Sequence, residues 1–337
     1  MRNFRVLESL RFFAALIIVI GHLFFYVQSK KFSISFTLVV EFFFVLSAFV
    51  ITLKQDTKKM EKVDIYQKNL FVGRTIRLLI PYIIIQTFYY IFFFRLFFKR
   101  GIGLYNWIIN LFLLQGFGLG DVLGGISGVA WTLGLEYWIG SLFFPIIYFL
   151  KKRINESLFF ISMIIFIISI TFRYYNSENF IITEFMRLFA SYSIGILCVI
   201  FYQRFKIKDF KNRKILFSIL EIIIIFIIIK IYGKVNYDRR NDYIFPIIAG
   251  VLILIFSYEY GIVSQLLKKL SNLGKLSYSM YLVHTFFIDA MYYLNIINPL
   301  NYIYLYIIIV IAVSFFIYYF IERKIINLKY HFLVKKS

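Results

Sequence analysis

The chain has little cysteine, histidine or acidic residue for its length. In 337 residues it carries 1 Cys, 3 His and 17 Asp or Glu. Cys198 is the only cysteine, so an intramolecular disulfide and a cysteine metal cluster are excluded. Three histidines argue against a multi-histidine metal site. We therefore look for chemistry among a few polar residues in apolar surroundings and expect no metal.

Apolar residues dominate what remains. The chain is 61% hydrophobic and 22% aromatic, with a mean hydropathy of +0.80. Soluble domains carry far less apolar surface, so we expect a multi-pass protein of the plasma or inner membrane, with the lipid bilayer as its surroundings. The net charge of +21 could indicate nucleic acid. The basic residues, however, lie in short loops between apolar runs, which is the pattern that orients membrane proteins, and we expect no nucleic-acid partner.

The apolar runs predict an all-α transmembrane helix bundle of about ten spans. They are expected at approximately residues 8–28, 33–53, 76–98, 129–150, 157–173, 184–203, 215–232, 243–260, 274–294 and 301–321. Segment 104–116 is apolar but too short to span, which indicates a re-entrant or interfacial segment. With ten spans, most Lys and Arg lie in loops on the same side of the membrane as the N-terminus. Since positive loops stay in the cytoplasm, both termini are predicted to be cytoplasmic. We find no internal repeat and expect one membrane domain over 1–337, without a separate soluble domain.

Arg11 and His22 stand out in the first span. Eleven residues make about three helical turns, so both side chains share one face, about 16 Å apart along the axis. Ionisable residues inside a membrane are costly, and a functional role is the default interpretation. The alternative is that Arg11 reaches the lipid interface and His22 bonds a neighbouring helix.

His22, Glu41 and Glu136 fall at similar depth on three different predicted spans. The depth follows from about 1.5 Å of rise per residue within each span. We interpret the coincidence as a shared polar cavity. The alternative is that each charged residue pairs separately with arginine or backbone and serves packing.

Arg74 and Arg77 are three residues apart at the cytoplasmic start of the third span. On a regular helix this spacing puts both guanidiniums on one face. Paired guanidiniums suit phosphate, because each offers a bidentate fork. Ordinary basic flanking of a span is the alternative.

These residues lie in blocks that resemble the acyltransferase-3 family of integral membrane O-acyltransferases, which modify bacterial surface glycans. The blocks are Leu10-Arg11 with His22, Glu41–Phe49, Arg74 with Arg77 and Pro81, Trp131–Glu136, Gly274–His284, and a closing Glu322 before a basic pair. The resemblance covers about residues 6–322. It departs from the family pattern at Ala48, where glycine is usual, at Thr132 and Gly134, where serines are usual, and at Tyr137, where many members carry a second acidic residue.

The resemblance implies acyl-coenzyme A, in particular acetyl-CoA, as donor substrate, with no permanently bound cofactor. The acceptor would be a hydroxyl of a cell-surface or lipid-linked glycan, and glycan-assembly proteins are possible partners. His22 would be the general base, with Glu136 or Glu41 orienting its imidazole. The cytoplasmic arginines would hold the donor phosphates, namely Arg11, Arg74 and Arg77. Further contacts to substrate are expected from Trp131, Ser277, Tyr278 and His284.

Three alternatives stay open at this stage. His22 could carry the acyl group covalently before the acceptor arrives. The chain could instead be a polysaccharide or lipid-linked sugar transporter or flippase, because intramembrane charges also mark transport pathways, although no inverted repeat is visible. It could also be a non-catalytic member of a glycan-assembly complex.

Overall fold

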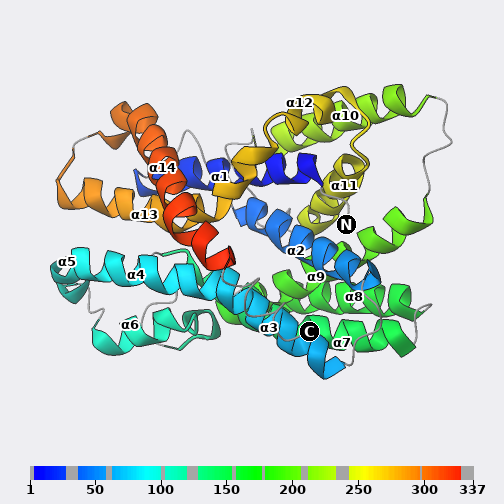
Figure 1. Cartoon of the computed structure of the whole chain (residues 1–337), viewed down its shortest axis with the longest axis horizontal. Coiled ribbons are helices and arrows are strands. Elements are labelled where there is room, and N and C mark those ends of the chain that lie inside the picture. The colour runs from blue at the N-terminus through cyan, green and yellow to red at the C-terminus, as the bar shows by residue number, and fades with distance from the viewer. Residues whose placement is uncertain are drawn as a thin grey trace. The chain divides into compact units, whose positions relative to one another are not determined.

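The computed structural model describes residues 4–27, 37–57, 63–99, 103–119, 128–153, 157–176, 179–205, 212–232, 243–296 and 298–327. Every regular element within these ranges is helical, as predicted (Figure 1). The chain divides into two compact units, and each is built from two separate stretches. The first unit comprises Met1–Lys58 and Leu150–Ser277, and the second comprises Lys59–Phe149 and Tyr278–Ser337.

The first unit is a bundle of apolar helices. Its elements are α1 (Arg5–Tyr26), α2 (Thr37–Thr57), α8 (Leu158–Tyr175), α9 (Phe180–Arg204), α10 (Arg213–Tyr232), α11 (Phe245–Tyr258), α12 (Ile262–Lys268) and the 3-10 helix η7 (Ser271–Leu276). Helix α9 packs on α2 through small residues, because a Cβ at Gly195 would collide with Ala48 and the Val45 carbonyl. Small residues let membrane helices approach closely.

Two buried carboxylates accept hydrogen bonds from backbone N–H groups at the starts of helices in the first unit. Glu221 of α10 accepts hydrogen bonds from the backbone N–H groups of Gly261 and Ser264, both at 3.1 Å, at the start of α12. Glu259 accepts from the Val6 N–H at 3.1 Å, in the first turn of α1. Helix N-termini leave backbone donors without intrahelical partners, and acceptors from neighbouring helices satisfy them here.

The second unit is also built from helices. Its elements are α3 (Val63–Arg74), the π-helix η2 (Thr75–Leu79), α4 (Ile80–Phe92), α5 (Phe94–Lys99), α6 (Leu104–Leu111), the 3-10 helix η3 (Gln115–Phe117), α7 (Ala130–Arg153), α13 (Ser277–Tyr293), the 3-10 helix η8 (Pro299–Tyr302), α14 (Ile303–Ile317) and the π-helix η9 (Tyr318–Glu322).

Segment 103–119 of the second unit folds back against α7. Helix α6 has only 8 residues, and the chain then turns at Leu113, whose φ is +59°. A Cβ at Gly134 would collide with the Leu113 carbonyl, and the Trp138 indole donates to the Phe112 carbonyl at 2.9 Å. Gly134, a departure from the family pattern, therefore lets this short segment dock on α7.

The number of spans differs from the prediction. Among the described residues, six helical stretches are long and apolar enough to cross a membrane, or up to seven if α11 and α12, bent by 78°, form one span. The six are Arg5–Tyr26, Asp64–Phe92, Ala130–Leu150, Leu158–Tyr175, Phe180–Arg204 and Pro299–Asn327.

Three predicted spans, 33–53, 215–232 and 274–294, fall on α2, α10 and α13, outside the set of six or seven. Helix α13 has 17 residues, α10 carries Lys214, Glu221 and Lys230, and the start of the second predicted span lies outside the described residues. The chain is therefore a multi-pass helical membrane protein, whereas the count of ten is not confirmed and the cytoplasmic termini stay a prediction.

Candidate functional site

His22 and Arg11 lie on one unbroken helix, α1. The His22 Nδ1 atom is 3.0 Å from the Ile18 carbonyl oxygen. A carbonyl can only accept, so Nδ1 carries the proton and Nε2 is the basic nitrogen in the neutral ring. Eleven residues nearer the N-terminus, Arg11 donates to Glu8 at 2.9 Å, and both side chains are partly exposed. Helix α1 thus holds a base with a defined tautomer and an accessible cation.

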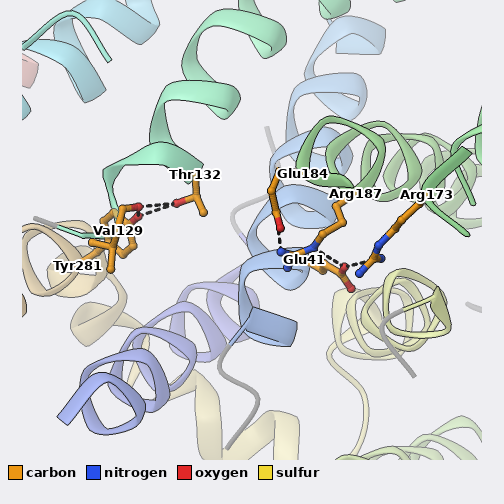
Figure 2. Close-up of polar contacts among 7 residues, drawn as sticks. All are labelled: Glu41, Val129, Thr132, Arg173, Glu184, Arg187 and Tyr281. Carbon is orange, nitrogen blue, oxygen red and sulfur yellow. Dashed lines mark hydrogen bonds and ion pairs between the residues drawn. The ribbon is translucent and has the colours of Figure 1, made fainter. Parts of the chain in front are cut away.

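Glu41 is fully buried in a network of four charged side chains in the first unit (Figure 2). Its Oε1 atom accepts from Arg187 at 3.0 Å and from Arg173 at 3.4 Å. Arg187 also donates to Glu184 at 2.6 Å. The Arg173 guanidinium additionally lies over the Tyr243 ring, 4.9 Å from its centroid. This geometry corresponds to the packing alternative for Glu41, because two guanidiniums compensate its charge.

Arg74 and Arg77, which the sequence places on one helix face, differ in burial. Arg74 is buried, whereas Arg77 is exposed. The cause is the π-helix η2, which begins directly after Arg74 and widens the turn beyond the 3.6 residues of an α-helix. Arg74 donates to the Glu136 backbone carbonyl and lies 3.7 Å from the Glu136 carboxylate.

Three of the predicted blocks meet inside the second unit. The Thr132 and Tyr281 hydroxyls are 2.6 Å apart, and Tyr281 also donates to the Val129 carbonyl, as Figure 2 shows. The Tyr278 hydroxyl donates to the Leu78 carbonyl. Together with the Arg74–Glu136 contact, these bonds join the blocks around Arg74, Trp131 and Tyr281, which are far apart in the sequence.

Tyr137, a departure from the family pattern, and Glu322, which matches it, also make hydrogen bonds in the second unit. Tyr137, which stands where many members have an acidic residue, places its hydroxyl 2.6 Å from the Thr75 hydroxyl. The closing Glu322 lies in the π-helix η9 and accepts a hydrogen bond from Ser279 of α13. Both π-helices of the second unit therefore lie next to residues of the predicted pattern.

The remaining predicted substrate residues make local hydrogen bonds. His284 is buried, and its Nδ1 donates to the Tyr281 carbonyl at 2.8 Å. Ser277 is buried and donates to the Gly274 carbonyl at 2.9 Å, and Gly274 lies directly against the Glu8 backbone of α1. Trp131 is half-buried at the start of α7. Contact of these residues with substrate stays a prediction.

Sequence reasoning missed several buried polar residues of the two units. Arg173 and Arg187 hold Glu41, and Tyr82, Gln86 and Gln115 are fully buried. The available signal was a polar side chain within an apolar run. It is visible for Gln86 and Arg187, but it gives no partner without the tertiary structure.

The helical architecture defines a multi-pass membrane protein. The family profile of the acyltransferase-3 family, an acyltransferase domain, matches residues 4–319. The chain therefore belongs to the acyltransferase-3 family, and the resemblance drawn from its sequence blocks is confirmed. No curated protein and no solved structure matches the chain at a significant level.

Proposed function

We propose that the protein transfers an acyl group, in particular acetyl, from acyl-coenzyme A to a hydroxyl of a cell-surface or lipid-linked glycan, with His22 as general base. Family membership supports acyl transfer as the reaction class. The observation that carries the base assignment is the bond between His22 Nδ1 and the Ile18 carbonyl. It leaves the Nε2 lone pair to accept the proton of the attacking hydroxyl.

In the proposed reaction the acceptor oxygen attacks the thioester carbonyl. His22 Nε2 takes the hydroxyl proton as the new ester bond forms, and the C–S bond then breaks. The thiolate of coenzyme A leaves with that proton, so the imidazole returns to its neutral form. A covalent acyl–His22 intermediate is the competing route, and trapping such an adduct in the absence of acceptor would support it.

The arginines divide into two roles in this proposal. Arg11 is partly exposed on α1 of the first unit, and an exposed guanidinium can bind the anionic phosphates of the donor. Phosphate binding by Arg77, which is exposed in the second unit, stays a prediction from the sequence. Arg74 is buried against Glu136, and we assign it to holding α7 in place rather than to phosphate. Glu41, enclosed by Arg173 and Arg187, is likewise assigned to positioning the helices of the first unit.

The first test removes the base. We expect His22→Ala to lose about 10²–10⁴-fold in acyl transfer, because general-base help contributes that much, while acetyl-CoA binding is retained. Purified protein in detergent is assayed for hydrolysis of and transfer from acetyl-CoA. His331→Ala is the matched control, since His331 lies in the basic C-terminal stretch. Wild-type transfer by His22→Ala would refute the assignment.

The second test removes a phosphate-binding cation. We expect Arg11→Ala to weaken acetyl-CoA binding about tenfold or more, because charge-assisted hydrogen bonds contribute about 1.5–3 kcal/mol. The loss should shrink at high salt. Arg204→Ala, at the exposed end of α9, is the control and should bind normally. Equal affinity of both variants would remove Arg11 from the donor site.

A further inference from the structure

Helices α4 and α13 of the second unit run alongside each other (Figure 1), and hydrogen bonds join the two segments near both ends. The buried polar residues of α4 include Tyr82, Gln86 and Tyr89. They are spaced by four and three residues, so they share one face. The Tyr89 hydroxyl donates to Asp289 of α13 at 2.5 Å.

At the other end of this pair, the Tyr278 hydroxyl donates to the Leu78 carbonyl. The two bonds pair residues in the same order, 78 with 278 and 89 with 289, so the helices run parallel. At the end of the helix pair marked by the Tyr89–Asp289 bond, Tyr89, Phe93 and Phe286 form an aromatic cluster. The polar stretch between the two bonds is thus bounded on both sides.

Several side chains of the second unit are buried without a hydrogen-bond partner, and Tyr82, Gln86 and Thr285 among them lie on α4 and α13 between these two bonds. Both polar atoms of the Gln86 amide lack one, as do both polar atoms of Gln115 and the Tyr82 hydroxyl, and all three residues are 0% exposed. The Thr285 hydroxyl, one turn before Asp289 on α13, also lacks a partner. Buried polar groups in proteins are almost always hydrogen-bonded, so each of these needs an explanation.

Gln115 reaches this place because of the fold of segment 103–119. The left-handed turn at Leu113 and the close contact of Gly116 with the Trp131 carbonyl carry η3 against α7. The Gln115 side chain then lies beside the Tyr82 hydroxyl, although not in the geometry of a regular hydrogen bond. The Tyr281 hydroxyl is a further neighbour of Tyr82. Three separate segments of the chain thus supply polar groups to one place.

The chemistry of these groups limits what they can bind. Each amide offers an acceptor oxygen and two donor hydrogens, and each hydroxyl can donate and accept. None of the four carries a charge, so an anionic phosphate would lack a compensating cation here. An acyl chain would leave every one of them unsatisfied. A neutral ligand with hydroxyl or amide groups satisfies donors and acceptors together.

We propose that Tyr82, Gln86, Gln115 and Thr285 form a binding site for a neutral, hydrogen-bonding ligand segment. Two sources fit this chemistry, namely the hydroxyls of a sugar acceptor and the hydroxyl and amides of the pantetheine arm of the donor. The identification with either substrate rests on the proposed function. The binding site itself does not, because it is argued only from buried polar groups.

The test uses the full chain in detergent, with Gln86→Leu and Gln115→Leu as similarly sized apolar variants. Thermal unfolding is followed without ligand, with D-glucose and with pantetheine. Without ligand, both variants should unfold at a higher temperature than the wild type, because unsatisfied buried amides are removed. One added ligand should stabilise the wild type, and its apparent affinity should fall about fivefold for each lost hydrogen bond.

Gln265→Leu is the matched control, since this exposed glutamine of α12 donates to the Glu259 carbonyl, and it should respond to the ligand like the wild type. Thr285→Val serves as a further variant if a glutamine variant fails to fold. A response to glucose alone assigns the sugar, and a response to pantetheine alone assigns the donor arm. The proposal is overturned if the wild type and the variants respond equally to both probes.

Failure of the proposed function would give a different result. In that case acetyl-CoA would neither bind nor be hydrolysed, while a glucose response that depends on Gln115 would persist. If instead acetyl-CoA is turned over normally by all variants and neither probe distinguishes them, the acyltransferase function stands and the neutral-ligand site falls.

Discussion

Buried acidic residues show at the level of single side chains why apolar helices of this protein tolerate charge. Glu41 is 0% exposed, yet it meets two guanidiniums, and Glu221 is 0% exposed and satisfies the first N–H groups of α12. A charge in an apolar interior is tolerable only when it is paired and hydrogen-bonded. The sequence marks Glu41 as a functional candidate, and the fold shows the arginines that compensate its charge.

A substitution at Glu41 tests this distinction. We expect Glu41→Gln to lower the free energy of unfolding by about 3 kcal/mol, because two buried guanidiniums lose their compensating charge. Thermal or denaturant unfolding in detergent measures the change. Glu8→Gln, which removes a partly exposed pair with Arg11, should cost only about 0–1 kcal/mol. If both variants lose equally little, Arg173 and Arg187 are compensated in another way.

Close approach of helices depends on a few small residues. Gly195 of α9 lies against Ala48 and the Val45 carbonyl of α2, and Gly134 of α7 lies against the Leu113 carbonyl. Ala48 itself stands where the family usually has glycine, so Gly195 supplies the room in this protein. The close packing of α2 and α9 therefore depends on a small residue from each helix, Ala48 and Gly195.

The close contact at Gly195 predicts how Gly195→Ala changes the stability of the protein. Alanine favours a helix over glycine by about 1 kcal/mol, but overpacking costs about 1–3 kcal/mol. Since the Val45 backbone carbonyl cannot rotate away like a side chain, we expect a net loss of stability in thermal unfolding. Gly103→Ala has nothing within 4 Å of its Cβ and should change stability little. A stabilised Gly195→Ala variant would show that α2 and α9 can separate without cost.

The π-helices are a second feature of the elements that residue spacing could not show. The sequence expectation for Arg74 and Arg77 used 3.6 residues per turn, which η2 does not have. The same kind of turn at η9 accompanies the burial of Glu322 against Ser279. Local hydrogen-bond register depends on packing against neighbouring helices, and a pattern of residue types does not reveal it.

At the scale of the whole molecule, the orientation in the membrane follows from charge alone and awaits measurement. We expect single cysteines in an otherwise cysteine-free Cys198→Ala background to report it. Arg2→Cys and Lys335→Cys should react with an impermeant maleimide only after the cells are permeabilised. Lys31→Cys, in a loop predicted to lie outside, should react in intact cells. Reaction of Arg2→Cys in intact cells would reverse the predicted topology.

The sequence by itself determined the helical membrane class and the acyltransferase-3 family. Hydropathy requires apolar helices in lipid, and the order and spacing of the blocks from Arg11 to Glu322 do not depend on packing. Helix number was less accessible, because broken and short helices such as α11–α12 and α13 read as ordinary apolar runs. The pairing of Glu41 with arginines was left open as one of two alternatives.

Only the tertiary structure decided which polar side chains meet. It joined Thr132 to Tyr281 and Arg74 to Glu136, and it separated the environments of Arg74 and Arg77. It also buried the amides of Gln86 and Gln115 without hydrogen-bond partners. The physical reason is that hydrogen bonds and burial depend on distances between residues far apart in the chain, and those distances are set by how helices pack rather than by the residues each helix contains.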